Sequence, residues 1–242
     1  MTPPAASGPT SKPAYRNRIL AALQKQEIAA LESHLVAVDF AQGDTLLNPG
    51  QSAEFAYFME AGLTSLIVVM ETGMSVEVGV VGREGFVGLP IVLGTSSMPT
   101  RTFIQIPGSG FRLKAGILRA ELERSETLRQ KTNRYIQAHL MQASQTAACN
   151  RLHDIAERLA RWLLMCQDRV QSDELQITHQ SLADMLGTPR STVTLAARML
   201  QKAGLIEYSR GHIRILNRKG LEEAACECYR SIRSECDRLG VL

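Results

Sequence analysis

Long hydrophobic runs, aromatic residues and a strong charge of either sign are all scarce in this 242-residue sequence. Apolar runs such as Leu66–Met70 are far shorter than the roughly 20 residues that cross a bilayer. The net charge of +3 excludes a protein that coats nucleic acid with its whole surface, so any nucleic-acid site must be local. Because 45% of the residues are hydrophobic, disorder of the whole chain is excluded as well.

Cysteine is absent from the first 148 residues, and the cysteines that follow are five, an odd number. A disulfide framework would be spread through a secreted chain, so reduced thiols are favoured. Residues 1–13 contain no continuous apolar segment of the kind a signal peptide needs, and we therefore expect a cytoplasmic protein without a membrane partner. The GxSxG, P-loop, HExxH and dinucleotide-binding motifs are all missing, so we expect no enzyme.

Glycine is concentrated in one region, where twelve of the eighteen glycines fall between Gly43 and Gly116. Turn-forming pairs such as Gly43-Asp44 and Pro49-Gly50 separate short β-prone runs. Many short strands with glycine turns predict a small jelly-roll-like barrel or β-roll. The expected strands are Val36–Phe40, Phe55–Met59, Ser65–Met70, Val76–Val81, Phe103–Ile106 and Phe111–Leu113. A helical apolar period precedes them, from Asn17 to Leu35.

The stretch from about Ser125 to Cys149 contains neither Gly nor Pro, which predicts a helix about 36 Å long. Along it, apolar and small residues recur at spacings of four, three and four, which is typical of a coiled-coil seam and predicts dimerisation. The seam residues are Ile136, Leu140, Ala143 and Ala147. A helix that packs on its own domain is the alternative, because the repeat is short.

Residues 178–216 predict a helix-turn-helix followed by a β-wing. Thr178 is the expected N-cap of the first helix and Gly187 its left-handed end. Thr188-Pro189 predicts the second helix, with the proline at its first helical position. The wing strands are expected at Leu205–Tyr208 and His212–Leu216. Between Leu186 and Lys219, seven Lys and Arg residues accompany a single glutamate, so basic charge is concentrated here.

The second helix has an apolar face and a polar face, as base readout requires. Arg190 can form a bidentate pair with guanine, and Leu195 can contact a thymine methyl group. Ser191 and Thr194 can reach bases or phosphates, and Arg198 lies on the same face.

One more helix start sets the boundary between the predicted domains. Asp154 and Glu157 form a capping-box-like pair that begins a new helix, ending near Arg169, so a domain boundary falls near residue 150. The predicted fold is α+β. Its segments are a disordered lead (1–16), a β-roll effector domain (17–124), a dimerisation helix (125–150) and a winged helix-turn-helix DNA-binding domain with a C-terminal helix (151–242).

Two sets of motifs together resemble the Crp/Fnr transcription regulators. Residues 177–183 (ITHQSLA), 188–193 (TPRSTV) and 199–206 (MLQKAGLI) resemble that family's DNA-binding domain. Gly43-Asp44, residues 49–51 (PGQ), residues 82–85 (GREG) and Gly88 resemble its cyclic-nucleotide-binding-type β-roll. The resemblance implies a homodimer on a near-palindromic DNA site, with half-sites about 34 Å apart and RNA polymerase as an expected partner.

The resemblance also assigns DNA contacts by position. Thr178 and Gln180 match phosphate-contacting positions, and Arg198 matches a backbone-contacting one. The base-reading positions are Arg190, Ser191 and Leu195. The last two replace a Glu and an Arg of the cAMP receptor, so the preferred DNA sequence should differ. The complete expected set is Thr178, Gln180, Arg190, Ser191, Thr194, Leu195, Arg198, Arg210 and His212.

The effector of the predicted β-roll is left open by the sequence. The resemblance places a pocket at Gly88, Leu89, Arg101, Thr102 and Ser144. Leu89 stands where cAMP binders keep a ribose-holding Glu, so the ribose hydroxyl would lose its acceptor. We therefore expect that the domain does not bind cAMP, and we expect no cofactor.

The sequence also bears on other sensors and on another function. An iron–sulfur cluster needs thiolates that the N-terminal half lacks. His34 is the only histidine before the long helix, and a lone histidine is far more often a capped or surface residue than a haem ligand. Cys226 and Cys228 are expected to point to different faces of one helix, which argues against a metal site. The role of these two and of Cys236 stays open. The alternative function is a signalling subunit that senses a nucleotide with its β-roll and uses the winged helix to bind a protein.

Overall fold

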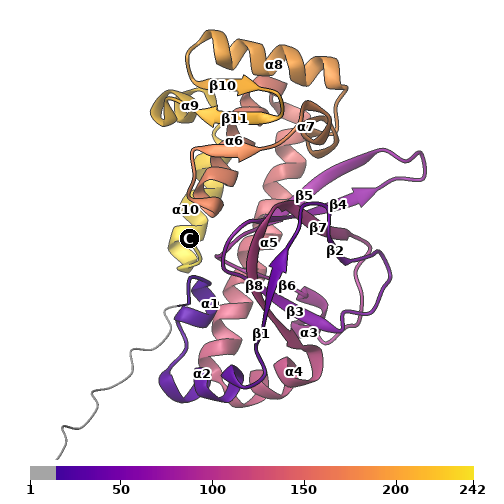
Figure 1. The fold of residues 1–242 in the computed structure, drawn as a ribbon, viewed down its shortest axis with the longest axis vertical. Coiled ribbons are helices and arrows are strands. Elements are labelled where there is room, and N and C mark those ends of the chain that lie inside the picture. The colour runs from indigo at the N-terminus through magenta and orange to yellow at the C-terminus, as the bar shows by residue number, and fades with distance from the viewer. Residues whose placement is uncertain (1–14) are drawn as a thin grey trace, which may run out of the picture.

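A computed structural model describes residues 15–242, which form a β-roll, a long helix and a smaller winged-helix domain (Figure 1). The mixture of helices and antiparallel sheets confirms the predicted α+β class. Residues 1–14 of the predicted lead lie outside the described residues. Tyr15 and Arg16, the last two residues of that lead, contact the β-roll: Tyr15 packs edge-on against Phe111, and the Arg16 amide donates to Glu60.

The β-roll consists of two four-stranded antiparallel sheets. One sheet has the order β1-β8-β3-β6, formed by Val36–Phe40, Gly108–Lys114, Phe55–Met59 and Phe86–Val87. The other has the order β2-β7-β4-β5, formed by Thr45–Leu47, Arg101–Ile106, Leu63–Val69 and Ser75–Val81. All six predicted strands are present. The short strands β2 and β6 were not predicted, because runs of two or three residues carry too little pattern to be recognised.

The helical period predicted from Asn17 to Leu35 is present and is divided between two helices, α1 (Arg18–Ala21) and α2 (Lys25–Glu32). Asn17 caps α1, whereas Gln24 and Glu27 form a capping box that starts α2. An apolar period continues across such a break, since both helices bury their apolar side against the same core. Two more helices, α3 (Leu89–Val92) and α4 (Ala115–Arg124), complete the β-roll domain.

The long helix α5 (Glu126–Leu152) packs against the β-roll along one side and continues to the C-terminal domain (Figure 1). Its buried side includes Tyr135 and Ala138. A Cβ on Gly79 of β5 would lie 2.5 Å from the His139 ring, so this glycine allows the close approach of the helix. On the opposite side, the seam residue Leu140 is 67% exposed. The helix therefore packs on its own domain. Of the predicted seam, Ile136 and Ala143 are half-buried, whereas Leu140 and Ala147 are exposed.

The C-terminal domain begins with the helix α6 (Ile155–Val170), which the Asp154–Glu157 capping box starts as predicted. A three-stranded sheet has the order β10-β11-β9, with residues Ile206–Ser209, His212–Ile215 and Glu174–Gln176. The wing of β10 and β11 was predicted; β9 was not. The remaining helices are α7 (His179–Leu186), α8 (Arg190–Lys202), α9 (Arg218–Ala224) and α10 (Cys228–Leu239).

Several buried polar contacts join the C-terminal domain to the β-roll. Arg169 of α6 pairs with Glu84 at 2.7 Å, and the Trp162 indole donates to Glu77 of β5 at 2.7 Å. The helix α7 also contacts β5, and α10 packs against α5. Within residues 15–242, none of the helices has the length and hydropathy that a membrane crossing requires.

Candidate nucleic-acid interface

The helix-turn-helix is set by local capping, largely as the sequence predicts. Thr178 caps α7, since its hydroxyl accepts a hydrogen bond from the Ser181 amide. Gly187 ends the helix in the left-handed conformation with φ of 60°. The start of α8 is wrong by one residue: Pro189 is the N-cap rather than the first helical residue, because its ψ of 143° is extended. Its carbonyl accepts the first bonds of the helix.

The helix α8 presents two different faces. Val193, Ala196, Ala197 and Leu200 are buried, and α8 packs against α6. The opposite side carries the predicted base-reading residues Arg190, Ser191 and Leu195, all exposed. Leu195 is 62% exposed, a large apolar side chain placed among polar neighbours. Figure 1 shows α8 at the end of the molecule away from the β-roll, where a large partner has access.

The structure brings most of the predicted DNA-contacting residues into two adjoining grooves. A groove of about 760 Å³ runs along α8. Its lining includes Arg190, Ser191, Thr194, Leu195 and Arg198. A second groove of about 490 Å³ is lined in part by Thr178, Gln180, Arg190 and Arg210. Because Arg190 and Tyr208 line both, the first turn of α8 connects the two grooves. His212 is exposed on β11 and lines neither of them.

The first groove also contains residues that sequence reasoning missed, among them His179 and Tyr208. Their rings stack at 4.0 Å between centroids with an interplanar angle of 10°. The His179 Nδ1 atom lies 3.0 Å from the Thr194 hydroxyl, which also donates to the Arg190 carbonyl. Burial, followed by the charges of Arg190 and Arg198, lowers the pKa of His179, so a neutral ring is favoured. No sequence spacing indicates this stack, since its members lie 29 residues apart.

The positive charge on this surface is not neutralised by ion pairs among the described residues. Arg190, Arg198 and Arg210 are exposed, and across residues 15–242 none of the three forms an ion pair. By contrast, Arg218 pairs with Asp168 and Glu222, away from the grooves. The three exposed guanidinium groups are therefore free to bind phosphate or guanine.

The predicted effector-pocket residues have varied surroundings. Leu89 is 6% exposed within the hydrophobic core, and Thr102 is 1% exposed. The Arg101 guanidinium donates to the Thr45 hydroxyl at 3.1 Å and lies 5.3 Å over the Phe103 ring. Ser144 is exposed on α5 and donates to the Leu140 carbonyl. Gly88 precedes α3 with φ of 119°.

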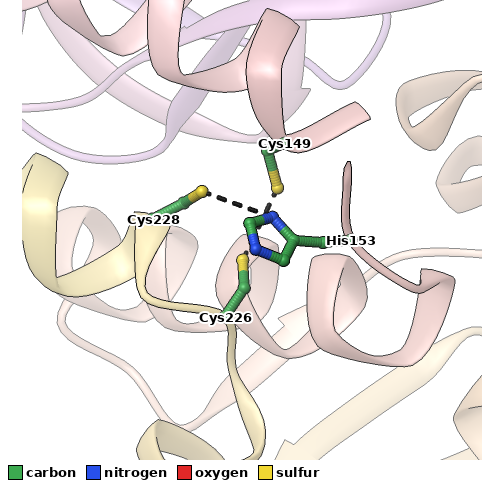
Figure 2. A group of neighbouring side chains, drawn as sticks. All are labelled: Cys149, His153, Cys226 and Cys228. Carbon is green, nitrogen blue, oxygen red and sulfur yellow. Dashed lines mark hydrogen bonds between the residues drawn. The ribbon is translucent and has the colours of Figure 1, made fainter. Parts of the chain in front are cut away.

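A group of neighbouring cysteine and histidine side chains lies where α5, α6 and α10 meet, at the joint between the domains (Figure 2). Cys149, His153, Cys226 and Cys228 offer ligand atoms that all lie within 4.8 Å of one another. The expectation that Cys226 and Cys228 share one helix and point apart is wrong. The chain leaves helical structure at Ala225, and α10 begins only at Cys228, so both sulfurs turn to the same centre.

Known proteins resemble this chain in sequence. Residues 157–224 match the family model of the Crp-like helix-turn-helix domain. The global nitrogen regulator of Synechococcus elongatus is 27% identical over 215 residues, which cover 82% of this chain and 93% of the relative. The transcriptional regulator SdrP of Thermus thermophilus is 29% identical over 196 residues, covering 78% and 93%.

Solved structures resemble it in fold. A transcriptional regulator of the CRP/FNR family from Thermus thermophilus is 25% identical with a TM-score of 0.65, over 78% of this chain and 98% of that chain. FixK2 from Bradyrhizobium japonicum is 17% identical with a TM-score of 0.69, over 79% and 98%. These likenesses confirm the predicted fold, in which an N-terminal sheet domain precedes a helix-turn-helix domain.

Proposed function

We propose that the chain is a transcription regulator of the Crp/Fnr type that binds a near-palindromic duplex as a homodimer. The match of residues 157–224 to the Crp-like helix-turn-helix domain supports this, as do the relatives and solved structures that are regulators. The observation that carries the proposal is the outward face of α8, where Arg190, Ser191 and Leu195 are exposed together beside the wing. Arginine with small polar and apolar neighbours fits the donor, acceptor and methyl pattern of a major groove. The uncompensated arginines supply the attraction to phosphate.

The uncovered side of α5 supports the homodimer. Leu140 is 67% exposed, although leucine on a regular helix is normally buried against a neighbour. Ala143 and Ala147 follow it along the same side and are small enough to let a second helix approach closely. Pairing two copies of α5 about a two-fold axis would bury this seam and present two α8 helices to successive major grooves.

We further propose that the β-roll acts as a sensor domain whose effector is not cAMP. Leu89 offers no acceptor to a ribose hydroxyl and is packed in the core. The Arg101 guanidinium already has Thr45 and Phe103 as partners. An effector would act by favouring one arrangement of α5 and the joint near His153 over another. Calorimetric titration with cAMP should give no binding heat, and micromolar binding would contradict this part.

The DNA-binding proposal is tested by selecting duplexes from a random pool and then titrating salt against the best sequence. We expect two symmetric half-sites about one helical turn apart and an affinity that falls steeply with salt. Absence of duplex binding at low salt would contradict the proposal and favour the signalling-subunit alternative. A cytoplasmic location and contact with RNA polymerase stay predictions.

The homodimer is tested with Leu140→Glu, which places a charge in the seam. The variant should sediment as a monomer and lose the preference for paired half-sites. Leu93→Glu is the matched control, since Leu93 is also exposed (59%) but lies after α3 in the β-roll. If both variants remain dimers, α5 is not the dimer interface.

A further inference from the structure

The Cys149–His153–Cys226–Cys228 cluster draws on segments far apart in the sequence (Figure 2). Cys149 lies in the last turn of α5, and His153 is the C-cap of that helix. Cys226 lies in the link after α9, and Cys228 is the first residue of α10. The three sulfurs are buried. Neither the DNA surface nor the β-roll uses these side chains, so their convergence needs its own explanation.

The geometry is close to that of a four-coordinate metal site. Metal–sulfur and metal–nitrogen bonds of about 2.3 and 2.0 Å in a tetrahedral zinc site place neighbouring ligand atoms about 3.5–3.8 Å apart. The Cys149 and Cys226 sulfurs are separated by 3.5 Å, and the Cys228 sulfur is 3.6 Å from the His153 Nδ1 atom. All remaining separations are within 4.8 Å. A small decrease in these separations would therefore let all four ligand atoms bind one ion.

Neighbouring side chains orient the members of the cluster as a metal site requires. His153 presents Nδ1 to the sulfurs, and its Nε2 atom lies 3.0 Å from a Glu227 carboxylate oxygen. Metal-binding histidines usually donate their other ring N–H to a carboxylate in this way. The Gln145 amide donates to the Cys228 sulfur at 3.1 Å, a contact that favours the thiolate.

We propose that Cys149, His153, Cys226 and Cys228 together bind one Zn²⁺ ion per chain. Three thiolates and one imidazole form a closed donor set of the kind found in structural zinc sites, with no position left for substrate. The thiols that are still protonated release their protons to solvent when the ion binds. The ion would fasten the end of α5 to the start of α10, directly at the joint where the DNA-binding domain leaves the dimerisation helix.

The test uses the full chain, reduced and stripped of metal, without DNA, so its outcome is independent of duplex binding. Zinc is titrated against a chromophoric chelator, and Co²⁺ serves as the spectroscopic probe. We expect one equivalent of zinc per chain and, with Co²⁺, the visible d–d and thiolate charge-transfer bands of a tetrahedral sulfur-rich site. Cys149→Ser and Cys226→Ser should weaken zinc binding by more than about 100-fold, and Glu227→Gln by about 10-fold.

Cys236→Ala is the matched control, because Cys236 is a buried cysteine of α10 that is not part of the cluster. It should keep the zinc stoichiometry and the cobalt spectrum of the parent chain. Zinc should also raise the melting temperature of the parent and of Cys236→Ala, but not that of Cys226→Ser. This readout separates loss of the ion from a general loss of folding.

Three results would each overturn the proposal. The parent chain could bind zinc no more tightly than Cys149→Ser and Cys226→Ser. The variants could retain zinc with the stoichiometry and spectrum of the parent. The reduced chain could show no affinity for zinc, while the oxidised chain forms a Cys149–Cys226 disulfide, which would assign the pair to thiol oxidation.

Discussion

The buried Arg169 and the exposed Arg190 and Arg198, all in the C-terminal domain, have opposite surroundings. Arg169 of α6 has a side chain only 2% exposed and is held by Glu84, Gln142 and the Met165 carbonyl. Arg190 and Arg198 of α8 are exposed and have no acidic partner in residues 15–242. The same side chain therefore fixes structure where its donors are satisfied internally, and is available for recognition where they are not.

The buried arginine connects three parts of the molecule. Glu84 belongs to the β-roll, Gln142 to α5 and Arg169 to α6. Gly82 allows this arrangement, because a Cβ there would lie 2.7 Å from the Arg169 Cβ atom. Substitutions in this buried Glu84–Gln142–Arg169 contact should thus change stability, whereas substitutions on the exposed face of α8 should change only DNA binding.

The largest effect is expected from Arg169→Met, which leaves Glu84 buried without its partner. Unfolding free energy should fall by about 3–5 kcal/mol, because an unpaired buried charge is strongly destabilising. Urea denaturation measures the change. Arg238→Met, which removes an exposed i,i+3 pair with Glu235, is the control and should leave the transition unchanged. If Arg169→Met unfolds at the same urea concentration as the parent, the stability of the fold does not depend on the Arg169–Glu84 pair.

The buried carboxyl group of Glu77 should make the stability of the protein depend on pH. Burial raises the pKa of Glu77 from its ordinary value of 4.5 to about 7, against the opposing hydrogen bonds from Ser65 and Trp162. Between these values the folded chain holds a proton that the unfolded chain has lost. The contribution of Glu77 to stability is therefore fully present below pH 4.5 and is lost as pH rises to about 7, by at most about 1.4 kcal/mol per pH unit.

Glu77→Gln removes the titrating group but keeps an acceptor for the Trp162 indole. Denaturation midpoints of this variant should vary less with pH in that window than those of the parent. Ser65→Ala removes a hydrogen bond that favours the ionised form, so its stability should continue to fall above pH 7. Equal pH profiles for the parent and Glu77→Gln would show that this carboxyl group does not titrate there.

How much of this could be predicted from the sequence depends on whether the signal is local. Thr178, Gly187 and the Asp154–Glu157 pair act within three or four residues, and the structure has each in its predicted role. The strand pattern identified the β-roll for the same reason. The predicted start of α8 was wrong by one residue, because a proline in extended conformation can itself be the N-cap.

Contacts between distant segments could not be predicted. Glu84 and Arg169 are 85 residues apart, and Cys149 and Cys226 are 77 apart. Nothing in the spacing of the residues brings either pair together; the packing of α6 and α10 against the rest of the chain does. The Cys149–His153–Cys226–Cys228 cluster was missed because Cys226 and Cys228 were expected on one helix, whereas the chain breaks between α9 and α10 and turns both sulfurs to the same centre.

On the exposed face of α8, Arg190→Ala should weaken binding to the selected duplex by about 1–3 kcal/mol and relax the base preference at one position of the site. The unfolding transition should not move, since Arg190 is exposed and forms no ion pair among the described residues. Fluorescence anisotropy and a repeated selection measure both effects. Met199→Ala, also exposed on α8 at 57%, is the control that should keep the base preference. An unchanged preference in Arg190→Ala would remove this residue from the base-reading set.

The smallest effect is expected from a substitution of Leu195, and it distinguishes the exposed face of α8 from the buried one. Leu195→Ala should leave stability unchanged, because Leu195 is 62% exposed, and should cost less than about 1 kcal/mol of duplex affinity through a lost methyl contact. Val193→Ala, two residues earlier and fully buried at 0%, should instead destabilise the domain by about 1 kcal/mol or more. Leu195→Ala should therefore change duplex binding and leave the denaturation transition unchanged, whereas Val193→Ala should shift the denaturation transition. If Leu195→Ala destabilised the fold and kept its base preference, the outward face of α8 would be a packing surface.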